Sequence, residues 1–152
     1  MHSVQNHIVR NGLLATLSRE DFAAISPCLE LVTLSKAQVL FEPFQPIEFV
    51  HFFEEGLSSE IASAAASSIE VGCIGREGLS GVPALLGAGT TPHKSFMQVG
   101  GRALRIRSGE LRDAMNASQQ LRALLLRYTH VFMIQLASTA LANGRYKVEQ
   151  RL

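Results

Sequence analysis

Residues 72–87 read GCIGREGLSGVPALLG, and this stretch decides the architecture of the chain. It holds five glycines in sixteen residues, which are costly in regular structure and common where the backbone turns tightly or approaches a ligand. Pro83 suits the first position of a short helix, and a glycine loop that opens a helix presents free N–H groups to an anion. Lys94 and Ser95 follow shortly after, with a cation and a hydroxyl for the same anion. The same residues also fit a tight strand–turn–helix corner that holds no ligand.

Short apolar runs separated by turn signals fill the region from residue 29 to residue 107. Runs rich in β-branched and aromatic residues favour strands. The runs lie at residues 29–34, 38–41, 47–53, 57–66 and 67–74. The segment from Met97 to Arg107 is interpreted as a hairpin that turns at Gly100-Gly101. Many short strands of this kind predict a β-sandwich or barrel.

Two groups of charged residues in this region are predicted to face solvent. Glu54 and Glu55 are interpreted as a solvated hairpin end. A second group is interpreted as a solvated strand edge: Arg102, Arg105 and Arg107. The two cysteines, Cys28 and Cys73, share no short spacing, so neither a metal knuckle nor a disulfide framework is predicted. We interpret both thiols as small buried apolar groups.

Helices are predicted on both sides of the β-rich region. Ser18, followed by acidic residues up to Asp21, is typical of a helix N-cap with an acidic first turn. On the far side, Ser108 is predicted to cap a short helix over residues 109–115. The strands are therefore expected to lie between helical segments.

The longest predicted helix is uncharged over much of its length. Ser118 is predicted to cap it, and it runs over residues 119–143, where Gly144 would end it. Between Arg127 and Arg145 it has no Asp, Glu, Lys or Arg. A surface helix needs only one apolar stripe, so this one requires cover on two sides. A second copy of the same helix in a two-fold homodimer is the simplest cover.

Composition narrows the class of protein. The 152 residues are 47% hydrophobic and 18% charged, which excludes disorder. The net charge of +1 gives no basic excess for binding a phosphate backbone. The longest nearly uncharged apolar stretch, residues 131–142, covers about 18 Å as a helix, too short for a bilayer core of about 30 Å. Residues 1–7 lack the pattern of a secretory signal, so we expect a cytoplasmic protein without membrane contact.

Several segments, in this order and spacing, resemble the sensory half of Crp/Fnr-type transcription regulators. They are NGLLA (11–15), LSREDF (17–22), GREG (75–78), Gly81 with Pro83, LLG (85–87), LRI (104–106) and LRALLLRY (121–128). The resemblance implies a mostly β fold with flanking helices. It is a double-stranded β-helix, or jelly roll, of about eight strands, followed by a long C-terminal dimerisation helix. It divides the chain into N-terminal helices (1–28), a cyclic-nucleotide-binding-like jelly roll (29–107) and the short and long helices (108–152).

The resemblance also implies the partners. In that family a DNA-binding winged helix-turn-helix follows the long helix, and residues 148–152 resemble the entry to it. We therefore expect a homodimer through the long helix, a small-molecule effector, and no DNA binding by this chain alone.

The resemblance places a phosphate-binding cassette in the glycine-rich region. Gly81 matches the family glycine, but Val82 replaces the glutamate that binds the ribose, and a valine side chain accepts no hydrogen bond. Lys94 stands where the family has arginine, which keeps the charge and loses the bidentate fork, and Ser95 matches the serine. A gap placed one residue differently would put His93 at the arginine position. The cassette is therefore degenerate.

The identity of the ligand stays open. The resemblance assigns Ser138 and Thr139, with Gln135, to contacts with a nucleotide base; the alternative is a polar notch in a helix–helix seam. Glu77 is either a displaced ribose acceptor or a solvated loop carboxylate. A cyclic nucleotide (cAMP or cGMP), another small anionic or apolar effector, and no ligand are all considered.

Other chemistries find less support in the residues. His51 or His130 could be an axial haem ligand, although a lone histidine on an apolar face is more often structural. No Ser–His–Asp arrangement with a nucleophile turn is visible, so no enzyme is predicted. Two interpretations remain: an effector-sensing and dimerisation domain of a Crp/Fnr-like regulator, and a ligand-free structural dimerisation module.

Overall fold

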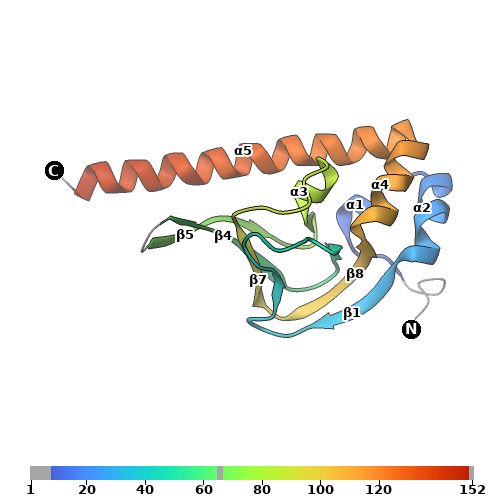
Figure 1. The fold of residues 1–152 in the computed structure, drawn as a ribbon, viewed down its shortest axis with the longest axis horizontal. Coiled ribbons are helices and arrows are strands. Elements are labelled where there is room, and N and C mark those ends of the chain that lie inside the picture. The colour runs from blue at the N-terminus through green and yellow to red at the C-terminus, as the bar shows by residue number, and fades with distance from the viewer. Residues whose placement is uncertain (1–7, 65–66, 151–152) are drawn as a thin grey trace.

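The computed structural model describes residues 8–64 and 67–150. Its centre consists of eight strands in two antiparallel sheets of four, ordered β1-β8-β3-β6 and β2-β7-β4-β5 (Figure 1). The strands are β1 (Glu30–Leu34), β2 (Val39–Phe41), β3 (Phe49–Phe53), β4 (Leu57–Ala64), β5 (Ser67–Ile74), β6 (Leu79–Ser80), β7 (Lys94–Val99) and β8 (Gly101–Arg107). The predicted jelly roll of about eight strands followed by a long helix is confirmed.

Helices enclose this roll at one end and along one side. They are α1 (Gly12–Ala15), α2 (Arg19–Ile25), the 3-10 turn η2 (Ser26–Cys28), α3 (Val82–Leu85), α4 (Ser108–Ala117) and α5 (Gln119–Gln150). Figure 1 shows α5 running along the roll and past β5, with α1, α2 and α4 at its other end. The Ser18 hydroxyl accepts a hydrogen bond from the amide of Asp21 at 3.1 Å, which confirms the predicted cap of α2.

One core joins the two sheets to the helices. Phe52, Leu104 and Met97 are buried between the sheets, and Leu121 and Leu125 of α5 are buried in the same cluster. Each fully buried side chain of this size contributes roughly 1.5–3 kcal/mol relative to an exposed one. The first turns of α5 are therefore part of the roll's core, whereas its later turns leave it.

The predicted hairpin at Gly100-Gly101 is wrong, because β7 and β8 belong to different sheets. β7 pairs with β2 and β4, whereas β8 pairs with β1 and β3. The two glycines form a corner that crosses between the sheets at close backbone distance. A Cβ on Gly101 would collide with the carbonyl oxygen of Glu55, and one on Gly100 would lie 3.0 Å from that of Leu34. Their lack of a side chain serves this crossing.

Two helix boundaries also differ from the prediction. Ser118 does cap α5, since its hydroxyl accepts from the Leu121 amide at 3.1 Å, but the helix continues through Gly144 to Gln150. No atom of the described residues lies within 4 Å of a Cβ position on Gly144, so no packing contact there ends the helix. Ser108 is the first residue of α4, and its hydroxyl donates to the Ile47 carbonyl at 2.7 Å instead of capping.

The structure corrects three predictions of which side chains are buried and which face solvent. Cys28 and Cys73 are exposed; Cys73 lies on the edge strand β5 between two inward-facing positions, so its side chain points away from the core. β8, which carries the three arginines, is an interior strand between β1 and β3. Glu54 is only 1% exposed.

No helix in the described part of the chain is both long enough and apolar enough to span a bilayer.

Candidate functional site

Gly81 lies at the junction between β6 and α3. Its φ of +113° lies in the left-handed region, and a Cβ there would lie 3.2 Å from Cγ2 of Val50. Both backbone conformation and packing therefore require glycine. Val82 is 6% exposed and its side chain belongs to the hydrophobic core. The valine at this corner therefore adds core packing, and its side chain offers no hydrogen-bond acceptor.

Lys94 and Ser95 point to opposite faces of β7, as adjacent strand residues do. Ser95 is fully buried, and its Oγ lies 3.0 Å from Oγ of Ser80, the residue before Gly81. The Lys94 side chain is 38% exposed, with its Nζ 3.9 Å from a carboxylate oxygen of Glu42. The structure therefore brings Ser95 to the Gly81 corner and directs Lys94 elsewhere.

A buried carboxyl that was not predicted from the sequence lies beside Ser80 and Ser95. Glu60 of β4 is 5% exposed and lies opposite Ser95 in the β4–β7 register. The Ser80 hydroxyl donates to its Oε1 at 3.3 Å. Burial raises the pKa of Glu60 to about 7, although hydrogen bonds from Ser95 and Ser80 oppose the rise. We call Glu60, Ser80 and Ser95 the interior cluster.

The wall around the interior cluster contains one more polar group. Ser58 lies two residues before Glu60 on β4, so both side chains share the inward face. Its Oγ is fully buried and has no hydrogen-bond partner among the described residues. The alternation of Ser58 and Glu60 in a strand was the available signal for a polar interior.

Helix α5 covers the roll next to the interior cluster. A Cβ on Gly72 of β5 would lie 3.2 Å from Leu136, 3.5 Å from Phe132 and 3.7 Å from Cβ of Glu60. Gly72 and Glu60 are also direct partners in the β4–β5 register. The absent side chain of Gly72 lets the helix approach the strand directly over the buried carboxyl.

Tyr128 of α5 anchors the helix to the strand that leads into Gly81. Its hydroxyl accepts a hydrogen bond from the Leu79 amide at 3.1 Å and donates to the Leu79 carbonyl at 3.2 Å. Burial raises the pKa of Tyr128 to about 12, so the hydroxyl keeps its proton at physiological pH. This contact could not be predicted from the sequence, because a tyrosine in a helical stripe gives no sign of its partner.

The two helical candidates for a base contact lie farther along α5. The Thr139 hydroxyl donates to the Gln135 carbonyl one turn earlier at 2.9 Å, and Ser138 is exposed. In the described part of the chain, neither hydroxyl hydrogen-bonds to the interior cluster or to Gly81. Gln135 and Glu77 both line a mostly apolar groove of about 300 Å³ between α5 and the end of β5, together with Val131, Tyr128 and Cys73. The structure therefore does not join these side chains to the Gly81 corner.

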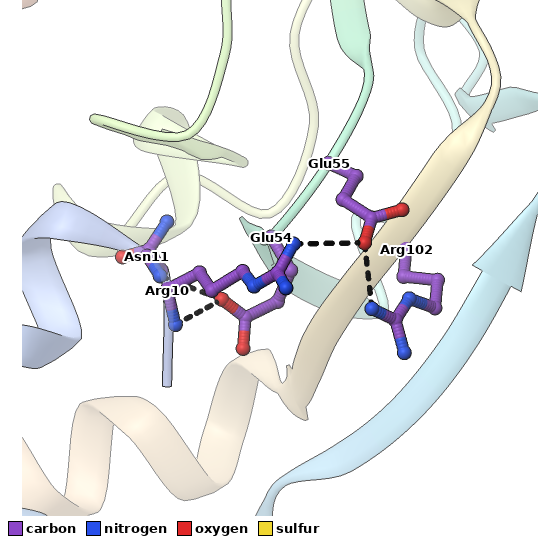
Figure 2. Close-up of polar contacts among 5 residues, drawn as sticks. All are labelled: Arg10, Asn11, Glu54, Glu55 and Arg102. Carbon is purple, nitrogen blue, oxygen red and sulfur yellow. Dashed lines mark hydrogen bonds and ion pairs between the residues drawn. The ribbon is translucent and has the colours of Figure 1, made fainter. Parts of the chain in front are cut away.

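The acidic pair Glu54-Glu55 has a structural role, which corrects its interpretation as a solvated hairpin end. Glu54 accepts hydrogen bonds from the backbone amides of Arg10 and Asn11, each at 2.6 Å (Figure 2). Glu55 lies 2.6 Å from Arg102 and 3.4 Å from Arg10, and the hydrogen bond from Arg102 lowers its pKa. The pair ties the N-terminal segment to the roll, because Glu54 accepts from two backbone amides of that segment and Glu55 pairs with Arg10.

The histidines considered as haem ligands lie in different surroundings. His51 is 5% exposed beside Phe49 and Arg105, and burial lowers its pKa to about 4. Its Nδ1 has no hydrogen-bond partner among the described residues. His130 is exposed on α5. Within residues 8–64 and 67–150, no three histidine, cysteine or acidic side chains are grouped to hold a metal ion.

Comparison with solved structures identifies the class of fold. The neighbours are Crp/Fnr-type regulators and cyclic-nucleotide-binding domains, including N-terminal domains of transcriptional regulators. The N-terminal domain of a transcriptional regulator from Streptomyces coelicolor matches with a TM-score of 0.61 and 21% identity, over 83% of this chain and 91% of that one. A putative cyclic nucleotide-binding protein from Geobacter metallireducens matches with a TM-score of 0.63 and 19% identity, over 86% and 89%.

The match to a longer regulator places the same fold within a larger chain. The Thermus thermophilus catabolite activator protein matches with a TM-score of 0.66 and 12% identity, over 89% of this chain and 63% of that one. No family model matches the sequence, and no curated protein matches it. At these identities the comparisons establish the shared fold.

Proposed function

We propose that this chain is the effector-sensing and dimerisation domain of a Crp/Fnr-like transcription regulator, with a degenerate cyclic-nucleotide cassette. The observation that carries the proposal is the Tyr128–Leu79 contact, which joins α5 to β6 two residues before Gly81. A ligand that moves the Gly81 corner would also bias the position of α5. Two sites coupled through one element in this way are what effector sensing requires.

The polar groups of the roll interior support the degenerate cassette. The interior cluster offers a carboxyl and two hydroxyls, with Ser58 nearby, while Lys94 lies on the opposite face beside Glu42. A cyclic phosphate would face Glu60 without a guanidinium to neutralise it, which disfavours the anion. We therefore propose a small effector that enters at Gly81, Val82 and Ser95, and we expect cAMP and cGMP to bind weakly.

Thermal unfolding of the chain with cAMP or cGMP tests the nucleotide. At 1 mM ligand, a site with a Kd of about 0.1 mM would stabilise the fold by about 1.4 kcal/mol, roughly 4 °C for a domain of this size. Because Lys94 lies on the opposite face of β7 from Ser95, we expect Lys94→Ala to leave any such shift unchanged. Native mass spectrometry of the purified chain is expected to show a retained small molecule. A purified chain that carries no small molecule and that no cyclic nucleotide stabilises would favour the alternative, a ligand-free structural dimerisation module.

The apolar surface of α5 supports a homodimer. Four large side chains on this helix are at least half exposed: Val131, Met133, Ile134 and Leu141. Sedimentation equilibrium at tens of micromolar is expected to give a dimer, and the double variant Val131→Glu/Ile134→Glu a monomer, because paired charges would be buried. Ala123→Glu, on an exposed site earlier in α5, serves as the matched control. A monomeric wild type would contradict dimerisation and leave the sensing proposal to the ligand experiments.

A further inference from the structure

A second cleft lies where α3, α4 and α5 meet, and residues at the C-terminal end of α3 line it. Its volume is about 320 Å³, within the range of small-molecule sites. Its floor is formed by Leu85 and Met115, which are 7% and 4% exposed. The groups that converge on it come from three elements, so the fold and not a local sequence pattern creates the cleft.

Two arginines from different helices line this cleft. Arg112 belongs to α4 and Arg122 to α5, and Nη1 of Arg122 lies 3.3 Å from Oδ1 of Asn116. Among the described residues, no carboxylate lies within ion-pair distance of either guanidinium. By contrast, Arg102 and Arg105 of β8 pair with Glu55 and Glu30. Guanidinium groups present planar donors that match carboxylate or phosphate oxygens.

Apolar side chains beside the arginines define the rest of the ligand. Leu86 is 59% exposed and Leu126 is 39% exposed, and both line the same cleft. Gly87 follows Leu86 with a φ of +83°, and no atom of the described residues lies within 4 Å of its Cβ position, so the rim is open at this point. A ligand with both an oxyanion and a short apolar group would bind here more tightly than one with the oxyanion alone.

We propose that this cleft binds a small organic oxyanion, with its phosphate or carboxylate group between Arg112 and Arg122 and its apolar portion against Leu86 and Leu126. The site is separate from the interior cluster and does not depend on the proposed effector site. Because it touches both α3 and α5, a ligand bound there would hold the end of the Gly81 corner against the long helix.

Nitrogen-15 NMR of the arginine Nε–Hε groups in the full 152-residue chain tests the proposal with butyl phosphate and pentanoate as probes. We expect saturable shifts of the Arg112 and Arg122 signals with at least one of the two anions, and the anion that binds identifies the head group. Butanol should give no such shifts. Arg112→Gln or Arg122→Gln should weaken binding about tenfold, the loss of one charged hydrogen bond. Arg127→Gln, an exposed arginine on α5 outside the cleft, should leave the affinity unchanged.

A further variant tests the apolar half of the site. Leu126→Ser should weaken butyl phosphate or pentanoate while leaving the weaker binding of inorganic phosphate or formate unchanged. Amide spectra of all variants check that the fold is retained. The proposal is overturned if neither anion saturates, or if Arg127→Gln weakens binding as much as the two cleft variants do, because the interaction would then be diffuse attraction between charges.

Discussion

The hydroxyl of Tyr128 bonds to both backbone groups of Leu79, accepting from its amide at 3.1 Å and donating to its carbonyl at 3.2 Å. β6 has two residues and lies at the edge of its sheet, with β3 on one side. The tyrosine therefore takes the place that a further strand would fill. It also fixes the distance between α5 and the segment that leads into Gly81, with little room to spare, since a Cβ on Gly78 would collide with the same hydroxyl.

Tyr128→Phe removes both hydrogen bonds and keeps the ring. The buried amide and carbonyl of Leu79 would then lack partners, so we expect unfolding to become easier by about 1–3 kcal/mol. Urea denaturation measures the loss, and faster hydrogen exchange at the Leu79 amide locates it. Thr139→Ala, which removes an exposed hydroxyl from the same helix, should change stability by less than about 0.5 kcal/mol. Equal effects of the two variants would contradict the role of Tyr128.

Asn11→Ala should reduce the stability of the fold more than most substitutions of a polar residue. The Asn11 side-chain amide donates to the carbonyls of Phe53 and Gly78, each at 2.8 Å, and its Oδ1 accepts from the Leu13 and Leu14 amides. Asn11 is fully buried, so its loss leaves these groups unsatisfied, at a cost of about 3 kcal/mol or more.

The N-cap of α2 offers a matched comparison for Asn11. Ser18→Ala removes one capping bond, and we expect a loss of about 1 kcal/mol. Both variants are compared in the same urea titration. An Asn11→Ala variant no less stable than Ser18→Ala would show that the bonds from Asn11 to the roll contribute little.

Glu60→Gln should stabilise the protein above neutral pH. The pKa of Glu60 is raised from 4.5 to about 7, so the folded state holds a proton that the unfolded state releases. Its contribution to stability is present below about pH 4.5 and is lost as pH rises through about 7, on the order of 3 kcal/mol in all. Glutamine is neutral at every pH, so the variant does not lose this contribution to stability. From pH 5 to pH 8 the stability of Glu60→Gln should rise relative to that of the wild type by about 2 kcal/mol; an unchanged difference between the two proteins would show that Glu60 is not buried.

Local sequence patterns predicted both serine caps, of α2 and α5, and seven of the eight strands to within a few residues; the two-residue strand β6 was not predicted. The expected strand at 57–66 is observed as Leu57–Ala64, and residues 65–66 lie outside the described part of the chain. The agreement follows because β-branched and apolar periodicity is a local property. The interactions that correct the predictions join distant segments. Glu54 is buried because it accepts from amides more than forty residues earlier, and no window of sequence around it contains those donors.

In the candidate site, too, the local feature could be predicted and the contacts between distant segments could not. The glycine at 81 was predicted from composition, and its positive φ agrees with the need for a tight turn. The strand register decides the rest: it faces Ser95 inward toward Glu60 and Lys94 outward toward Glu42. Aligning residues with a family cassette could not distinguish the two faces, because the exact start of β7 sets them.

His51→Leu should change the pH dependence of stability in the opposite direction from Glu60→Gln. In the wild type the effects of His51 and Glu60 on stability nearly cancel as pH changes, and the two variants separate them. Burial, with a smaller effect of Arg105, lowers the pKa of His51 from 6.5 to about 4. Its contribution is therefore present above about pH 6.5 and is lost as pH falls through about 4, since only the unfolded state takes up the proton. Between about pH 4.5 and 6.5, stability rises with pH through His51 and falls with pH through Glu60. In that window Glu60→Gln should become more stable with rising pH and His51→Leu less stable, each relative to the double variant measured by thermal unfolding. Parallel pH profiles for the two single variants would contradict the burial of both groups.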